Sequence, residues 1–122
     1  ATSVCIGGKS VGGRIASRMA DEAEVDGLVC WEYPFHPAGK PDKLRTEHLK
    51  SIATPTLIVP GERDAFGNKA EVARYKLSKN IQWHGLPDGD HSFKPRKASG
   101  KTWDGNLDDA VEAVASFVAK GN

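Results

Sequence analysis

The stretch VCIGGKSVGG, residues 4–13, decides how the rest of the sequence is interpreted. Its apolar run, residues 4–6, stops at paired glycines, and residues 12–20 resume with helical spacing. The pattern Gly8-x-Ser10-x-Gly12 therefore lies between a predicted strand and a predicted helix. In that context G-x-S-x-G forms a nucleophile elbow, a sharp turn that exposes a reactive serine.

Steric crowding in such a turn explains why glycines are found there. A serine at its tip is strained, and we expect any side chain at Gly8 or Gly12 to collide with the strand or the helix. The helix that begins there directs N–H groups and its positive dipole end at the place where an oxyanion would form. We expect the N–H of Val11 to be one oxyanion donor.

Two other interpretations of this stretch compete with the elbow. One is an ordinary glycine-rich turn between strand and helix, in which Ser10 only caps the helix. The other is a phosphate loop, because Gly8-Lys9-Ser10 resembles the end of a Walker A motif. That motif requires glycine five positions before Gly8, where this chain has Ser3. Nucleotide binding is therefore disfavoured.

Length and composition predict a single domain over residues 1–122. The formal net charge of +1 gives no reason to expect nucleic acid or a membrane surface as a partner. We find no apolar run of membrane-span length and no leader pattern, so a cytoplasmic location is expected.

Cys5 and Cys30 lie in strand-like runs and are expected to be buried, reduced thiols. No metal-ligand spacing is present, and no cofactor is implied.

Apolar strand-like runs alternate with helical ones along the whole chain. This alternation predicts an α/β fold in which a mostly parallel sheet of about four strands is flanked by helices. The run 55–60 is continuous and apolar, as in a strand buried on both faces. Asp42 and Asn68 are candidate helix caps. The predicted strands are 4–6, 25–31, 55–60 and 81–86, and the predicted helices are 12–20, 44–52, 68–77 and a last one carrying the stripe from Leu107 to Val118.

Ser10, Asp64 and His91 each follow the end of a predicted strand. Because sites in open parallel sheets form outside the carboxyl ends of the strands, we expect the three side chains to meet at one edge. Serine is a poor nucleophile until a neutral imidazole takes its proton, and a carboxylate must hold that imidazole in the right tautomer. The chain therefore predicts a Ser-His-Asp triad.

The acid of this triad has alternatives. Asp64 could be a turn aspartate held by nearby backbone N–H groups, and Glu62 lies in the same loop. Asp88 and Asp90 are interpreted as turn residues, with Asp90 raising the basicity of its neighbour.

The base has alternatives too. His48 lies on a predicted helix face and His84 inside a predicted strand, where histidines are usually structural. His36 follows the second strand in a proline-rich loop and is expected to contact substrate. His91 follows the last strand in a glycine-containing loop and is the preferred base.

We predict a substrate pocket lined by Lys9, Tyr33, Phe35 and His36. Trp31 is a further candidate, although Trp31 and Phe35 could equally belong to the core. The basic segment 94–101 is interpreted as a solvated loop. An anion or nucleic-acid contact there is the alternative, but no aromatic residue alternates with the charges to stack on bases.

Taken together, these motifs resemble the C-terminal half or more of a predicted α/β-hydrolase family. That family includes bacterial dienelactone-hydrolase-like proteins, testis-expressed α/β-hydrolase-like proteins and a scaffold subunit of a nuclear histone-acetyltransferase complex. The chain order Ser, Asp, His is that of α/β-hydrolase triads. The resemblance implies Ser10 as nucleophile, Asp64 as acid and His91 as base, and Val11 stands where methionine is usual. The stretches that carry it are 7–14, 33–37, 41–45, 54–59, 61–64 and 88–91.

The resemblance also implies strands and a helix before the elbow, including a loop that gives a second oxyanion donor. Here the elbow strand begins almost at residue 1. We therefore expect a truncated α/β-hydrolase that forms a homo-oligomer through its exposed first strand or is only partly active. The function expected is that of a serine hydrolase of small carboxylic esters. A non-catalytic α/β-hydrolase-like interaction module is the alternative.

Overall fold

The structure is a computed structural model that describes residues 4–120. Strands and helices alternate along the chain, as the sequence predicts. The elements are β1 (Cys5–Lys9), α1 (Val11–Ala23), β2 (Gly27–Trp31), the 3₁₀ turn η1 (Glu47–Lys50), β3 (Thr56–Val59), α2 (Lys69–Val72), β4 (Ile81–Trp83), the 3₁₀ turn η2 (Lys97–Ser99) and α3 (Trp103–Lys120).

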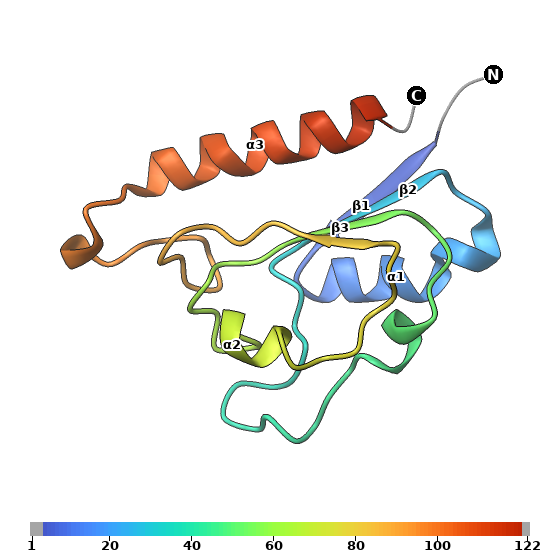
Figure 1. Ribbon diagram of the computed structural model, residues 1–122, viewed down its shortest axis with the longest axis horizontal. Helices are drawn as coiled ribbons and strands as arrows, with labels where there is room; N and C mark the ends of the chain where they lie inside the picture. The colour runs from blue at the N-terminus through green and yellow to red at the C-terminus, as the bar shows by residue number, and fades with distance from the viewer. Residues whose placement is uncertain (1–3, 121–122) are drawn as a thin grey trace.

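The four strands form one parallel sheet in the order β1-β2-β3-β4. Helix α3 lies along one face of this sheet, and α1 and α2 lie on the other (Figure 1). Because all strands run the same way, their carboxyl ends share one edge. The predicted α/β class and the predicted four-stranded parallel sheet are confirmed.

β3 shows how the sheet is held between its helical layers. All four of its residues are buried. Leu57 and Val59 belong to the apolar cluster that includes Ala110 of α3, whereas Ile58 belongs to the cluster that includes Ala16 of α1. Alternate side chains of a strand point to opposite faces, so one short apolar run contributes to both cores.

The connection from β2 to β3 differs from the prediction. In place of a helix over 44–52 capped by Asp42, it forms the single turn η1, which begins after Thr46. Tertiary hydrogen bonds explain the difference. The N–H of Arg45 donates to the carbonyl of Phe35 at 2.7 Å, and the hydroxyl of Tyr33 donates to the carbonyl of Arg45 at 2.9 Å. The first bond uses the N–H that a cap at Asp42 would accept, and the second occupies the carbonyl that would accept from Leu49 in a longer helix.

Two further elements are shorter than predicted. Asn68 does cap α2, through a capping box with Glu71, but the helix ends at Val72 instead of Leu77. β4 ends at Trp83 instead of residue 86, and the indole ring of Trp83 lies where a side chain at Gly85 would be. Beyond Trp83 the N–H groups of His84 and Leu86 still donate to the carbonyls of Ile58 and Pro60, both at 2.9 Å.

The cysteines differ in exposure. Cys30 is buried, as predicted, and burial raises the pKa of its thiol to about 12. Cys5 is exposed, and its predicted burial is wrong because β1 is an edge strand. Both thiols are free. Among residues 4–120, no helix has the length and apolar character needed to span a bilayer.

The outer edge of β1 carries unpaired backbone groups. The carbonyl of Val4 accepts from Asp26, and the N–H of Ser10 donates to Trp31, each at 2.7 Å, so even-numbered residues face β2. The N–H and C=O groups of Cys5, Gly7 and Lys9 therefore point to the free edge. Helix α1, which follows this strand, carries an exposed apolar stripe: Val11, Ile15 and Met19.

We propose that a second copy of the chain pairs with this edge, since unpaired strand edges favour such pairing. Sedimentation velocity under reducing conditions should show concentration-dependent dimers. Cys5→Pro should shift the equilibrium towards monomer, because it removes an N–H that points away from β2. Cys5→Ala, which keeps that N–H, should not. A single monomeric species at all concentrations would contradict the proposal.

Candidate active site

Ser10 lies at a sharp turn between β1 and α1. Its backbone has φ 53° and ψ −119°, outside the regions that non-glycine residues usually adopt. Such a conformation costs on the order of 1–3 kcal/mol and persists only where the surroundings enforce it. Here the N–H of Ser10 donates to the carbonyl of Trp31 at 2.7 Å, which ties the turn to the end of β2. The geometry is that of the predicted elbow.

The two glycines flanking Ser10 are not equivalent. A Cβ at Gly8 would lie 2.3 Å from the carbonyl carbon of Gly12 and 2.4 Å from the nitrogen of Gly13. A Cβ at Gly12 would meet no heavy atom within 4 Å. The expected collision at Gly12 is therefore wrong. Gly13 is the second crowded position, because its Cβ would lie 2.7 Å from the carbonyl oxygen of Gly8.

Ser10, His91 and Asp64 form a continuous hydrogen-bonded chain. The Oγ of Ser10 lies 3.0 Å from Nε2 of His91, and Nδ1 of His91 lies 2.8 Å from Oδ2 of Asp64. The Asp64 side chain is fully buried, and that of His91 is 24% exposed. A carboxylate can only accept, so Nδ1 carries a hydrogen and Nε2 of the neutral ring is free to accept the serine proton.

The buried carboxylate of Asp64 uses both of its oxygens. Oδ1 accepts the backbone N–H of Phe66 at 2.8 Å, while Oδ2 faces His91. The ring of Phe66 packs against the imidazole of His91, with 4.4 Å between centroids. Phe66 therefore helps to fix both members of the pair, a role that the sequence did not indicate.

The loops after β3 and β4 are held together at Gly61. This residue forms a parallel bridge with Leu86, and a Cβ on it would lie 2.1 Å from the carbonyl oxygen of Asp90. Two residues on, the N–H of Arg63 donates to the carbonyl of Gly89 at 2.8 Å. Only glycine permits this approach, which brings the carboxylate of one loop to the imidazole of the other.

The His91 loop is anchored at both of its ends. Asp90 accepts the N–H groups of Ser92 and Lys94 at 2.8 and 3.0 Å, as expected of a turn residue. Asn106 of α3, buried at the sheet, donates to the carbonyls of Pro87 and Phe93 at 3.0 and 2.9 Å. The last helix thus positions the histidine loop.

Asp88 and Glu62 are engaged away from the triad. Asp88 accepts hydrogen bonds from the side chain and backbone of Arg96, and these bonds lower the pKa of its carboxyl to about 2. Glu62, the alternative acid, pairs with Lys69 at 3.3 Å. Asp64 is the carboxylate that contacts His91.

A second serine–histidine contact lies further along α1. The Oγ of Ser17 is 2.7 Å from Nε2 of His48, but Ser17 also donates its hydroxyl hydrogen to the carbonyl of Arg14 at 2.7 Å. A hydroxyl has one hydrogen, so Nε2 of His48 must be the donor to Ser17. That proton arrangement is the reverse of what a catalytic base needs. Burial, followed by the charges of Arg18 and Arg14, lowers the pKa of His48.

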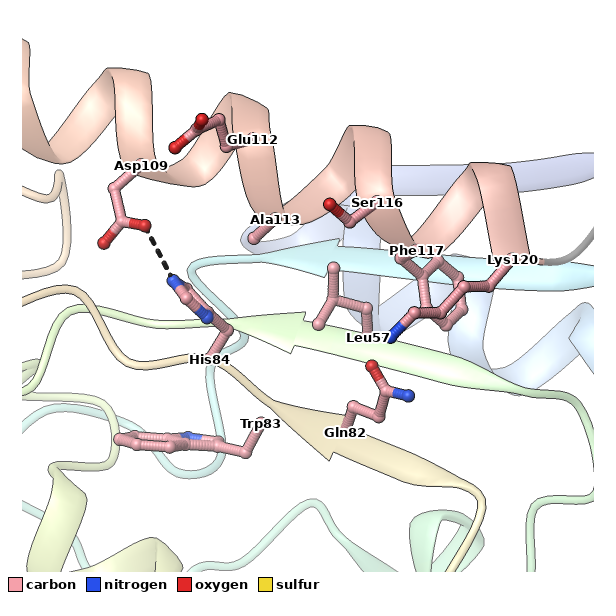
Figure 2. A pocket seen from close by; sticks show the side chains of 10 residues that line it. All are labelled: Leu57, Gln82, Trp83, His84, Asp109, Glu112, Ala113, Ser116, Phe117 and Lys120. Carbon is pink, nitrogen blue, oxygen red and sulfur yellow. Dashed lines mark hydrogen bonds and ion pairs between the residues drawn. The ribbon is translucent and has the colours of Figure 1, made fainter.

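The remaining histidines are occupied elsewhere. Nε2 of His84 lies 3.0 Å from Asp109 of α3, in a cavity of about 430 Å³ between β4 and that helix (Figure 2). His36 is buried, with Nε2 2.8 Å from Glu71 and Nδ1 2.8 Å from the carbonyl of Pro37.

Of the four residues predicted to line a substrate pocket, three are buried and one is exposed. Tyr33 and Phe35 are fully buried in the α1-side core, with 4.9 Å between ring centroids. His36 is also buried, and both of its ring nitrogens are hydrogen-bonded. None of these three side chains therefore faces solvent. Lys9 is exposed, and its amine lies 3.9 Å from a carboxylate oxygen of Glu32.

Glu32 is a site residue that sequence reasoning missed. It follows β2 at the carboxyl edge of the sheet, with φ 54° and only 4% exposure. Burial raises the pKa of the Glu32 carboxyl, and the charge of Lys9 opposes this rise. The charge of Glu32 in turn contributes to raising the pKa of His91. Its position at the end of a central parallel strand was the available signal. Within residues 4–120 no cluster of three His, Cys, Asp or Glu side chains could hold a metal ion.

Comparisons with known proteins support the fold. A family model described as an alpha/beta hydrolase domain matches residues 1–119. Among solved structures, an alpha-beta serine hydrolase homologue from Coxiella burnetii matches 97% of this chain with a TM-score of 0.64 and 19% identity, a likeness of fold. The match covers 49% of that protein, so this chain spans about half of its length. No curated protein gives a significant match.

The ring of His91 should titrate above the ordinary histidine value. Its hydrogen bond to Asp64 is the largest cause of the raised pKa, opposed by burial and assisted by the charges of Asp64, Glu32 and Asp90. NMR titration should show a large fall in the pKa of His91 in Asp64→Asn and a smaller fall in Glu32→Gln. A His91 pKa at or below that of an exposed histidine would contradict this arrangement.

Proposed function

The chain belongs to the alpha/beta hydrolase family, and on that premise we propose that it is a serine hydrolase that cleaves small carboxylic esters through an acyl-enzyme. The observation that carries the proposal is the hydrogen-bonded chain from Ser10 through His91 to Asp64. It supplies a nucleophile, a base and an orienting acid in contact distance at the strand ends.

In the first half of the reaction, Oγ of Ser10 attacks the ester carbonyl while its proton passes to Nε2 of His91. Asp64 keeps the hydrogen of the neutral ring on Nδ1 and stabilises the imidazolium that forms. The protonated ring then gives its Nε2 proton to the departing alkoxide. The products of this half are an alcohol and an acyl group bound to Ser10.

In the second half of the reaction, a water molecule takes the place of Ser10 as the nucleophile. Nε2 of His91 takes a proton from water, the resulting hydroxide attacks the acyl carbonyl, and the proton returns to Oγ of Ser10 as the carboxylic acid leaves. Because His91 must be neutral to accept a proton, its raised pKa sets the acid limb of the pH–rate profile above the ordinary histidine value. Activity should rise with pH through that pKa.

The oxyanion of each tetrahedral intermediate forms beside the first turn of α1. Val11 is the first residue of this helix, where N–H groups lack intrahelical partners and the helix dipole is positive. We assign the N–H of Val11 as one oxyanion donor. A site with a single donor is expected to turn over about 10²- to 10³-fold more slowly than one with two.

The Lys9–Glu32 pair borders this site. Lys9 directly precedes Ser10, and its exposed amine is held near the rim by the buried carboxylate of Glu32. The exposed amine of Lys9 is well placed to contact the acyl or alcohol part of a small ester. Lys9 is the exposed member of the predicted pocket, whereas Tyr33, Phe35 and His36 are buried.

Hydrolysis of p-nitrophenyl acetate tests the proposal directly. Ser10→Ala should lower kcat by at least about 10³-fold, because it removes the nucleophile. The matched control is Ser17→Ala, which alters the other serine–histidine contact of the same helix and should leave turnover within a few-fold of the parent. Circular dichroism melts would verify that both variants fold.

Equal activity of Ser10→Ala and the parent would overturn the hydrolase proposal and favour the non-catalytic interaction module. Loss of activity in a folded Ser17→Ala variant with retention in Ser10→Ala would transfer the nucleophile to Ser17.

A further inference from the structure

A basic cavity of about 570 Å³ lies between α1 and the connection from β2 to β3. Its lining includes neither Ser10, Asp64 nor His91, so it is separate from the site described above. The residues that line it are Arg14, Arg18, Leu44, Arg45, Glu47, His48 and Ser51.

The cavity gathers positive charge without a matching carboxylate. Among the described residues 4–120, no ion pair involves Arg14, Arg18 or Arg45. Glu47, the one acidic residue of the lining, is 92% exposed at its side chain and pairs with Lys50 at 3.1 Å. Three guanidinium groups therefore share one cavity with their charge uncompensated.

The positive charges around this cavity repel one another. Arg14 and Arg18 are four residues apart and lie on the same face of α1, where like charges destabilise a helix. Nε of Arg14 is buried and donates to no acceptor. A buried donor without a partner is unfavourable, and it calls for an explanation in a native structure. An anion in the cavity would offset the repulsion between the arginines.

The hydrogen-bond partners of His48, which also lines the cavity, decide which of its ring nitrogens carries the hydrogen. Tyr33 donates its hydroxyl hydrogen to the carbonyl of Arg45 at 2.9 Å, and Ser17 donates its own to Arg14, so both hydroxyl oxygens face Nε2–H of His48, at 3.3 and 2.7 Å. With Nε2 protonated, Nδ1 is the position at which His48 gains a second hydrogen. Protonation would add a positive charge facing Arg14 and Arg18 on α1 and Arg45 and Glu47 on the connection.

We propose that this cavity binds a phosphate group, either as free phosphate or as part of a small phosphorylated molecule. Guanidinium groups present several N–H donors in a fixed fork that matches phosphate oxygens, and three of them with one exposed acid form a strong anion site. The volume leaves room for more than the phosphate itself. The site is independent of the proposed hydrolase activity, and its test uses no turnover.

Isothermal titration with inorganic phosphate tests the proposal on the parent chain and on two variants. Arg18→Gln removes an exposed guanidinium of the cavity, and Arg74→Gln removes an exposed one beyond α2 with the same change in net charge. Phosphate should bind the parent and Arg74→Gln alike. Its Kd should rise at least tenfold in Arg18→Gln. A parallel titration with glycerol 2-phosphate distinguishes the two possible ligands. Tighter binding of glycerol 2-phosphate than of phosphate indicates a phosphorylated molecule, and equal binding indicates free phosphate.

NMR titration of His48 gives a second readout. A bound dianion should raise the pKa of this ring, which burial and the neighbouring arginines hold below its ordinary value. The proposal is overturned if phosphate at about 10 mM neither binds nor shifts His48, or if Arg18→Gln and Arg74→Gln weaken binding equally, as general charge screening would.

Discussion

The hydrogen bond between the buried carboxylate of Asp64 and Nδ1 of His91 is the interaction on which the site depends. It joins two loops that follow neighbouring strands, and it forms because Gly61 lets their backbones approach closely. It fixes the tautomer of His91, so that Nε2 faces Ser10 as an acceptor. It also raises the pKa of the ring. The strained turn at Ser10 then brings the hydroxyl to the same edge.

Much of this arrangement could be predicted from the sequence. The glycine pattern around Ser10 and the apolar runs predicted a parallel sheet, and parallel strands bring their carboxyl ends to one edge whatever their lengths. Placing Ser10, Asp64 and His91 after strands was therefore enough to predict their meeting. The family expected from the motifs is the one whose model matches the chain.

What the sequence could not predict depends on tertiary contacts. η1 is a single turn because Arg45 is tied to Phe35 and Tyr33, and helix propensity carries no information about that tie. Tyr33, Phe35 and His36 were placed at a pocket because their loop follows a strand, but the loop folds back and buries them. Glu32 was missed because its position after a strand was its one signal in the sequence, and its burial and positive φ emerge only in the structure.

A crystal structure of the protein treated with a fluorophosphonate tests the central claim most directly, because a phosphonyl group on the nucleophile resembles the tetrahedral intermediate. The account predicts phosphorus bonded to Oγ of Ser10, the phosphonyl oxygen within hydrogen-bond distance of the N–H of Val11, and His91 between Ser10 and Asp64. An unmodified Ser10, or an adduct on another residue, would contradict it.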